Sequence, residues 1–338
     1  MKRPILKSAL SESMYLFLDR EERTHSSGSL RAYYNSLKSF DSYLCEINYC
    51  DKEISMTTLT IWIEQLGEKS KGTRKHYQSA LYSFLDFAQE LGIKSTRPDL
   101  IRTDSDYAPH IYTDGERNNL HMIADSFTVQ KSCQLPYIRV EIPMAMRILD
   151  SCGTRVTETL SIQMKDVDLY KGIITMRYAK GNKERIVPMD ESLTEIIEKY
   201  CMAMGIMGRP EAYLFPKKDM TAHLNDRDFR NYFLRILKRA KVEIPRDRKY
   251  QRSVCAHDLR HSFSCRSLNA MISSGMDEED AVPYLSTYIG HKDLYSTERY
   301  LQYPTEHFYE EVAIHEHYAK DILNDTPLFQ EDITTWRK

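Results

Sequence analysis

The chain has no hydrophobic run that approaches the roughly 18 residues of a membrane-spanning helix, so we expect no membrane partner. No secretory signal pattern is evident at the N-terminus. Seven cysteines form no Cys-x-x-Cys pair and no metal-ligand series. We therefore expect reduced thiols, no bound metal and a cytoplasmic protein. Low-complexity segments and internal repeats are also absent, and a length of 338 residues favours two ordinary globular domains.

Net charge is small as well: at −2, it counts by itself against a nucleic-acid partner. The distribution of charge indicates the opposite. Residues 151–265 hold 22 lysines and arginines against 15 acidic residues, whereas residues 266–338 hold 6 against 14. Ten basic residues lie between Asp226 and Arg252. A charge run is usually a solvated face, but next to the motifs below we interpret this one as a phosphate-tracking surface. Its candidate DNA contacts are Arg230, Lys238 and Arg239.

Two motifs near the C-terminal end place histidines beside an arginine and a tyrosine. In HDLRHSF, His257 and Arg260 are three residues apart, so on a helix both side chains project from one face. In YIGHKDLYSTERY, His291 and Tyr300 are nine apart, which would put them on opposite faces of one unbroken helix. A tyrosine hydroxyl, with an ordinary pKa of about 10, becomes a nucleophile at neutral pH only beside cations or a base. The two motifs supply both.

The residues around His291 predict a break in the helix. Gly290 precedes the histidine, and Ser296 is a good helix cap. We therefore expect His291 on a turn and Tyr300 on the short helix that follows.

A further arginine lies upstream, in SCGTRVTETLSIQMKDVDL. Arg155 follows a helix break at Gly153, and Glu158 comes one turn later. Because arginine pairs best in a planar, bidentate geometry, Glu158 is placed to hold this guanidinium in a fixed orientation.

A lysine-rich hairpin is predicted by YAKGNKERIVPM, residues 178–189. Two short strands flank Gly181-Asn182, which is a strong two-residue turn signal. Lys180 and Lys183 lie on either side of this turn and can reach away from the sheet. Lys183 and Arg185 are further candidate DNA contacts.

The order of these residues resembles that of the tyrosine recombinases of the phage-integrase family: an arginine, a lysine on a hairpin, His-x-x-Arg, a histidine or tryptophan, then a tyrosine. The resemblance covers the C-terminal two-thirds of the chain closely and the N-terminal third only in helical character. It implies catalytic roles for Arg155, Lys180, His257, Arg260, His291 and Tyr300. Glu158 is expected to support Arg155 and not to take part in the chemistry.

Other residues compete for the nucleophile and base roles. Among 23 tyrosines, most of which must be packing residues, Tyr295 and Tyr303 lie close enough to rival Tyr300. Only Tyr300 has the family spacing from the preceding histidine. His261 could rival His257, which is preferred because it stands in the matched His-x-x-Arg pattern.

The hairpin leaves a similar choice between two lysines. Hairpin lysines are normally just solvated. Lys180 is favoured over Lys183 as the catalytic lysine because it directly precedes the turn glycine.

The family mechanism implies a transesterification without metal or cofactor. Tyr300 would attack a DNA phosphodiester, join the 3′-phosphate and release a 5′-hydroxyl. The arginines would neutralise charge on the non-bridging oxygens, and Lys180 would protonate the departing oxygen. His257 would be the acid–base partner of the tyrosine, and His291 would hydrogen-bond the phosphate. The sequence shows no carboxylate cluster like that of two-metal nucleases, which favours strand transfer over hydrolysis.

The N-terminal third predicts four helices. Two have clear apolar stripes, one beginning at Ser29 as N-cap and one over residues 72–92; shorter helices are expected over 9–22 and 57–66. Apolar stripes of this kind are normally core. In the resemblance this region is the core-binding domain, which grips DNA opposite the catalytic domain. Its phosphate contacts would be Lys69, Lys71, Arg74 and Lys75.

The expected fold is mainly α-helical with a small antiparallel β-sheet, in two domains. Residues 1–100 form the helical DNA-binding domain, residues 101–113 a linker, and residues 114–338 the catalytic domain, with an oligomerisation segment from about residue 305. The hairpin is expected near residues 172–188. The catalytic domain's helices are expected near 114–126, 136–151, 155–163, 191–204, 226–241, 256–274 and 278–288.

The implied partners are double-stranded DNA, three further copies of the chain in a tetrameric synaptic complex, and possible accessory proteins. The approach to the Gly-His pair, AVPYLSTYIGH, resembles recombinases of transposons and integrative elements more than the Xer resolvases. Two alternatives remain at this point. One is a type IB topoisomerase, which reseals the same strand, and the other is a DNA-binding regulator with vestigial catalytic residues.

Overall fold

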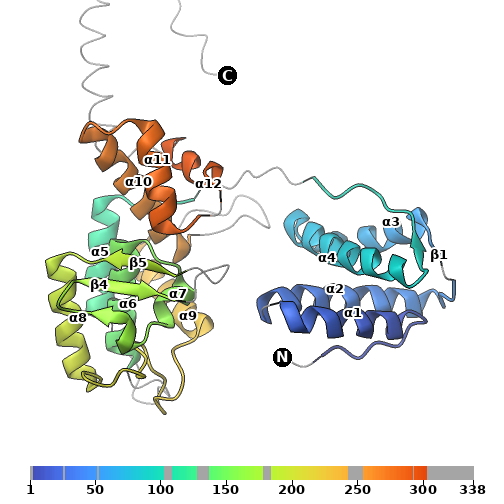
Figure 1. The fold of residues 1–338 in the computed structure, drawn as a ribbon, viewed down its shortest axis with the longest axis horizontal. Helices are drawn as coiled ribbons and strands as arrows, with labels where there is room; N and C mark the ends of the chain where they lie inside the picture. The colour runs from blue at the N-terminus through green and yellow to red at the C-terminus, as the bar shows by residue number, and fades with distance from the viewer. Residues whose placement is uncertain are drawn as a thin grey trace, which may run out of the picture. The chain divides into compact units, whose positions relative to one another are not determined.

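The computed structural model describes residues 3–25, 27–51, 53–102, 109–127, 137–177, 184–242, 254–291 and 293–302. It confirms a mainly helical protein with a small antiparallel sheet. The chain divides into two compact units, Met1–Tyr107 and Ala108–Lys338 (Figure 1), each with a buried core. None of the helices described could span a bilayer.

The first unit contains the four expected helices: α1 (Ser11–Thr24), α2 (Ser27–Glu46), α3 (Met56–Gln65) and α4 (Lys71–Glu90). Their shared core is aromatic, with Phe40, Trp62 and Phe84 almost completely buried. Ser55 and Ser70 cap α3 and α4 by accepting from backbone N–H groups one turn later.

Two features of the first unit differ from expectation. Ser29 is not the N-cap of α2, because the helix already begins at Ser27. Two short strands, β1 (Glu53–Ile54) and β2 (Lys94–Ser95), pair in parallel beside the helices. Each strand has two residues, which is too short to leave a period-two pattern in the sequence.

The second unit is built from helices around a three-stranded sheet. The long helices are α5 (Asp114–Asp125), α6 (Ile138–Cys152), α8 (Glu191–Met204), α9 (Asp226–Ala240), α10 (His257–Ser273) and α11 (Glu278–Ile289). Shorter pieces are α7 (Val156–Leu160), the 3-10 helix η2 (Met164–Asp166), α12 (Tyr295–Glu298) and the 3-10 helix η3 (Arg299–Gln302). The helix expected over 155–163 therefore ends early, at Leu160.

The sheet is antiparallel in the order β3 (Val167–Asp168), β4 (Ile173–Met176) and β5 (Arg185–Pro188). Ile174 is paired with Val187, and both are completely buried. The hairpin expected near 172–188 is present as β4 and β5, while its proposed turn at Gly181-Asn182 lies outside the described residues.

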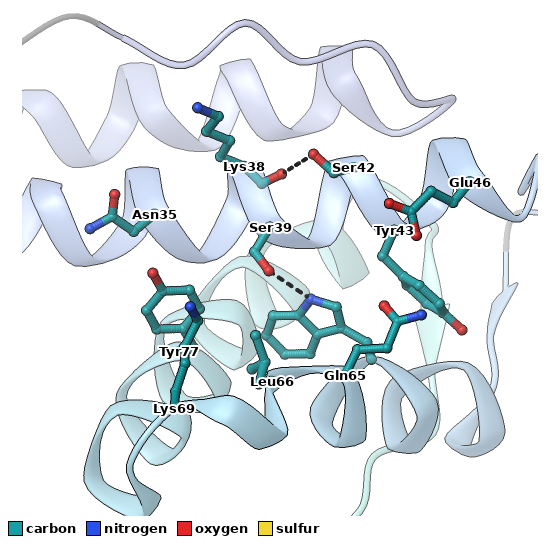
Figure 2. A pocket seen from close by; sticks show the side chains of 11 residues that line it. Asn35, Lys38, Ser39, Ser42, Tyr43, Glu46, Gln65, Leu66, Lys69 and Tyr77 are labelled. Atoms are coloured by element: carbon teal, nitrogen blue, oxygen red, sulfur yellow. Dashed lines mark hydrogen bonds between the residues drawn. The ribbon is translucent and has the colours of Figure 1, made fainter. Parts of the chain in front are cut away.

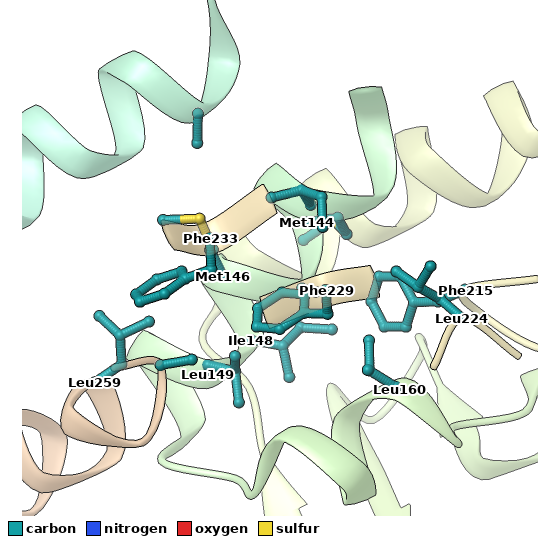
Figure 3. Close-up of a cluster of buried hydrophobic side chains, with 14 of the residues drawn as sticks. Met144, Met146, Ile148, Leu149, Leu160, Phe215, Leu224, Phe229, Phe233 and Leu259 are labelled. Carbon is teal, nitrogen blue, oxygen red and sulfur yellow. The ribbon is translucent and has the colours of Figure 1, made fainter. Parts of the chain in front are cut away.

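Two apolar clusters support the second unit. The larger one joins α6 to α9 and α10, with Phe229, Phe233 and Leu259 facing residues of α6 (Figure 3). The smaller one packs α10 against α11 through Cys265, Leu285 and other residues, and it includes Tyr300. The predicted nucleophile is thus held by a hydrophobic contact between helices.

Asp150 ties three helices of the second unit together. The buried carboxylate of this α6 residue accepts from Arg117 at 2.9 Å and from Arg266 at 3.0 Å, and it lies 3.1 Å from the His121 ring. Burial would raise the pKa of the Asp150 carboxyl, but the three partners hold it well below its ordinary range. The network fixes α10, which carries the His-x-x-Arg motif, against α5 and α6.

Candidate active site

Arg260 is buried at the centre of the predicted site. Only 1% of this residue is exposed, and its guanidinium donates to the carbonyls of Gly153 at 2.7 Å and Ile289 at 2.6 Å. Burial, followed by the nearby charge of Arg155, lowers its pKa to about 10. The side chain therefore remains cationic at neutral pH. A buried cation bonded to neutral carbonyls favours an anionic ligand.

Arg155 also binds the end of α11, where Arg260 donates to the Ile289 carbonyl. It stands immediately before α7, and Gly153 in left-handed conformation ends α6 just upstream, as expected. The Arg155 guanidinium donates to Glu158 at 2.6 Å and to the Gly290 carbonyl at 2.9 Å. The prediction of a bidentate pair between Arg155 and Glu158 is therefore wrong. One guanidinium nitrogen donates to the carboxylate, and the other donates to the carbonyl of Gly290. Arg155 and Arg260 thus hold consecutive carbonyls at the end of α11.

Glu158 is buried and pairs with a second arginine. Arg185 on β5 donates to the other carboxylate oxygen at 2.7 Å, and only 11% of the Arg185 side chain is exposed. Burial would raise the pKa of the Glu158 carboxyl, yet Arg185 and then Arg155 hold it at about 2. The structure therefore places Arg185, a candidate DNA contact in the sequence, within the charge network behind Arg155.

Tyr300 lies in η3 with 3% of the residue exposed. Its hydroxyl oxygen is 3.0 Å from the Nδ1 atom of His261. Burial raises the pKa of Tyr300, while a hydrogen bond with Ser264 and the charge of Arg260 act in the opposite direction. The histidine at hydrogen-bond distance from the predicted nucleophile is therefore His261, the rival that sequence reasoning placed second.

His291 follows the left-handed Gly290 that ends α11, as expected of a histidine on a turn. Its Nδ1 atom lies 2.8 Å from the Thr297 hydroxyl, and its ring stacks at 6.1 Å from that of Tyr300. Burial and the charges of Arg260 and Arg155 lower its pKa to about 4, so the ring is neutral at pH 7. Ser296 is not the cap of the next helix: it donates to Asp293 instead.

His257 is the first residue of α10, and its ring meets the His261 ring edge-on at 4.8 Å. Lys180 and Lys183 lie outside the described residues, in the segment between β4 and β5. Arg155, Arg260, His261, His291 and Tyr300 therefore converge, with His257 beside them. No group of three or more His, Cys, Asp or Glu suited to a metal occurs in the part of the chain that the structure describes.

Three other candidate DNA contacts of the second unit share one helix, α9. Arg230, Lys238 and Arg239 are exposed on α9, and Arg239 also lies over the Phe127 ring at 4.7 Å. This placement is compatible with a phosphate-contacting surface.

Lys69, one of the candidate contacts of the first unit, lines a surface cavity of about 420 Å³ (Figure 2). Lys69 lies at this cavity with its ammonium 5.5 Å from the Tyr77 ring centre. Polar side chains of α2, among them Asn35 and Ser39, line the opposite side (Figure 2). Lys71 is exposed, whereas Arg74 and Lys75 are half-buried on the first turns of α4.

Comparison with known proteins agrees with this geometry. The model of the phage integrase family matches residues 130–307, which span the motifs from Arg155 to Tyr300. The chain belongs to the phage integrase family. Tyrosine recombinase XerD of Listeria monocytogenes is 26% identical over 300 residues, covering 82% of this chain and 89% of that protein. XerD of Pseudomonas putida is 31% identical over 161 residues, covering 46% and 47%.

Solved structures share the fold of this integrase-family protein. XerH recombinase bound to its difH substrate matches with a TM-score of 0.64 at 18% identity, covering 90% of this chain and 83% of that one. The Tn1549 transposon integrase matches with a TM-score of 0.62 at 15% identity, covering 93% and 100%. Similar proteins thus include Xer recombinases and a transposon integrase, so the closer resemblance to transposon recombinases stays a prediction.

Proposed function

We propose that this protein is a site-specific DNA recombinase that cuts and rejoins strands through a 3′-phosphotyrosine on Tyr300. The observation that carries this proposal is the convergence of two arginines on one turn. Arg155 and Arg260 donate to the carbonyls of Gly290 and Ile289, the two residues directly before His291. His291 is nine residues before the buried Tyr300. Two fixed guanidinium groups near a tyrosine hydroxyl suit an in-line attack on a phosphodiester.

Each side chain then has a role in the reaction. Tyr300 attacks phosphorus, and the two arginines neutralise charge that develops on the non-bridging oxygens. His291, neutral at pH 7, hydrogen-bonds the phosphate. Lys180 protonates the departing 5′-oxygen, and His257 assists proton transfer. Attack by a 5′-hydroxyl from another strand reverses the step, so the bond energy is retained without a nucleotide cofactor.

The substrate in this proposal is double-stranded DNA bound by four copies of the chain, with accessory proteins as further partners. A solved structure of lambda integrase contains a tetramer on a Holliday junction. Residues 305–338, which lie outside the described residues, are the proposed connector between protomers. Their deletion should leave binding to a single site intact and abolish strand exchange. In this proposal the protein works in the cytoplasm, at the nucleoid when bound to DNA.

The test begins by sequencing the DNA that flanks the gene for inverted repeats. A plasmid is then built that carries two copies of the repeats identified there. The proposal expects excision of the DNA between the copies, with Tyr300→Phe as the inactive control. Relaxation of a supercoiled plasmid without excision would favour a type IB topoisomerase. Binding without any strand breakage by the unaltered protein would favour a regulator with vestigial catalytic residues.

A further inference from the structure

His261 is outside the predicted catalytic set but lies within hydrogen-bond distance of the predicted nucleophile. Its Nδ1 atom is 3.0 Å from the Tyr300 hydroxyl oxygen, which is the atom that must lose a proton when it attacks phosphorus. The two rings are 5.7 Å apart and tilted by 55°. Both residues are held by well-packed elements, since His261 is on α10 and Tyr300 belongs to the apolar cluster between α10 and α11.

The exposures of the two residues suit a proton transfer from one to the other. Tyr300 is 3% exposed, so bulk water has little access to its hydroxyl. His261 is only half-buried, and the ring of His257 lies beside it at 4.8 Å. A proton taken up by His261 can therefore leave toward solvent, whereas a proton on Tyr300 needs a neighbouring acceptor. An imidazole is suited to that task because its ordinary pKa is near 6.5.

We propose that His261 is a further catalytic residue, the base that accepts the Tyr300 proton. This inference rests on the proposed recombinase function. As the Tyr300 oxygen forms its bond to phosphorus, the O–H bond breaks and the proton passes to Nδ1 of His261. The bond from phosphorus to the 5′-oxygen breaks, and that oxygen takes a proton from Lys180. In the reverse step a 5′-hydroxyl attacks phosphorus, and the tyrosine oxygen recovers its proton from His261.

Other charged and titratable groups surround this pair. Arg260 and His257 lie on the same helix as His261, and His291 stacks on the Tyr300 ring from the turn after α11. Arg299 precedes Tyr300 and contributes to its electrostatic environment. These groups also influence the ionisation of Tyr300 and His261. The test must therefore distinguish two proton transfers: the one that removes the proton of Tyr300 and the one that donates a proton to the departing 5′-oxygen.

The decisive variant is His261→Asn, which keeps a hydrogen-bonding atom near the Nδ1 position but cannot accept a proton. The measurement is the single-turnover rate of covalent adduct formation on a nicked duplex that carries the site identified by the excision test. One duplex has oxygen and another has sulfur at the 5′-bridging position, because sulfur leaves without protonation. A general base is worth about 10²–10⁴-fold, so His261→Asn should be slower by that factor on both duplexes. Lys180→Ala should recover on the sulfur duplex.

His223→Asn is the matched control, because this half-buried histidine bonds to the Leu224 carbonyl away from the site; its rate should be unchanged. The role of His261 would be overturned if sulfur restored the rate of His261→Asn, or if this variant reacted within about threefold of the rate of the unaltered protein. Either result would leave the recombinase function standing. No adduct from the unaltered protein on either duplex would overturn the recombinase function and this inference with it.

A second measurement needs neither DNA nor a folded His261 variant. In the DNA-free protein, ¹⁵N NMR should show His261 protonated on Nε2, with Nδ1 as acceptor. Tyr300→Phe should shift the Nδ1 signal of His261 far more than any signal of His223. A proton on Nδ1 of His261 would contradict the proposal.

Discussion

The Arg185 guanidinium donates to the Glu158 carboxylate at 2.7 Å, and this bond links strand β5 to the helix that begins next to Arg155. Glu158 is shared, since Arg155 donates to its other oxygen at 2.6 Å. The Nε and Nη1 atoms of Arg185 are buried without a hydrogen-bond partner in the part of the chain that the structure describes. Arg185 therefore acts through Glu158 on the position of Arg155.

Arg185→Ala should slow adduct formation by about 10–100-fold, because Arg155 loses the support that fixes its carboxylate partner. It should also lower the free energy of unfolding by about 3 kcal/mol, since a buried carboxylate loses one of two cations. Lys199→Ala, on the exposed face of α8, is the control and should change neither quantity by much. Unchanged stability and cleavage in Arg185→Ala would return this residue to the role of a plain DNA contact.

Arg155→Ala and Arg260→Ala should each reduce the rate of strand cleavage by about 10²–10³-fold, because charge developing at the phosphate loses a preorganised partner. Their effect on DNA affinity should be much smaller, since other phosphate contacts remain. Single-turnover cleavage and equilibrium binding on one duplex separate the two effects. Equal losses in both would mean that these arginines only bind DNA.

Glu141 predicts a pH dependence of stability. This α6 residue is 1% exposed, and burial raises its pKa from 4.5 to about 8. Between these values the folded protein holds a proton that the unfolded chain has lost. Stability from this group is therefore complete below about pH 4.5 and falls by about 1.4 kcal/mol per pH unit as the pH rises toward 8.

Glu141→Gln should remove that loss and make the protein more stable than the unaltered chain at pH 8. Urea unfolding at pH 5, 6.5 and 8 would measure it, with Glu195→Gln on the exposed face of α8 as control. If the unaltered protein and Glu141→Gln lose stability in parallel as the pH rises, Glu141 is not the cause.

The exposed cations of α9 should affect affinity and not chemistry. Arg230→Ala and Lys238→Ala should each weaken DNA binding uniformly across sequences, and each should reduce the slope of log K against log salt by about 1. Binding titrations at several salt concentrations give this slope. A slope that does not change would place DNA on another face of this unit.

Much of the fold follows from local sequence signals. Helix α8 has the predicted bounds, 191 to 204, because Asp190 caps its start and Gly205 ends it in the left-handed conformation. The break between Gly290 and Tyr300 was also predicted from a glycine. The caps predicted at Ser29 and Ser296 are wrong because a serine can cap a helix, stand inside its first turn or bond to a neighbouring aspartate, and residue type alone does not distinguish these cases.

The site was less predictable where it depends on packing between distant elements. His257 and His261 are four residues apart, so they share one face of a helix, and the position of η3 decides which of them meets Tyr300. Arg185 is predicted as a DNA contact because the residue pattern of a strand does not reveal which side chains pack beside it. In the structure, Arg185 donates to the buried carboxylate of Glu158. The sequence signal for this contact is the presence of a third charged partner, Arg185, on a strand predicted near the Arg155–Glu158 pair.

The most direct test of the account is to find the residue joined to DNA. The protein is incubated with a nicked duplex that carries the site identified by the excision test, and the denatured adduct is digested and sequenced by mass spectrometry. The account predicts a 3′-phosphate on the peptide that contains Tyr300, and no adduct from a Tyr300→Phe variant that still binds the duplex. An adduct on Tyr295 or Tyr303, or one that persists in Tyr300→Phe, would contradict it.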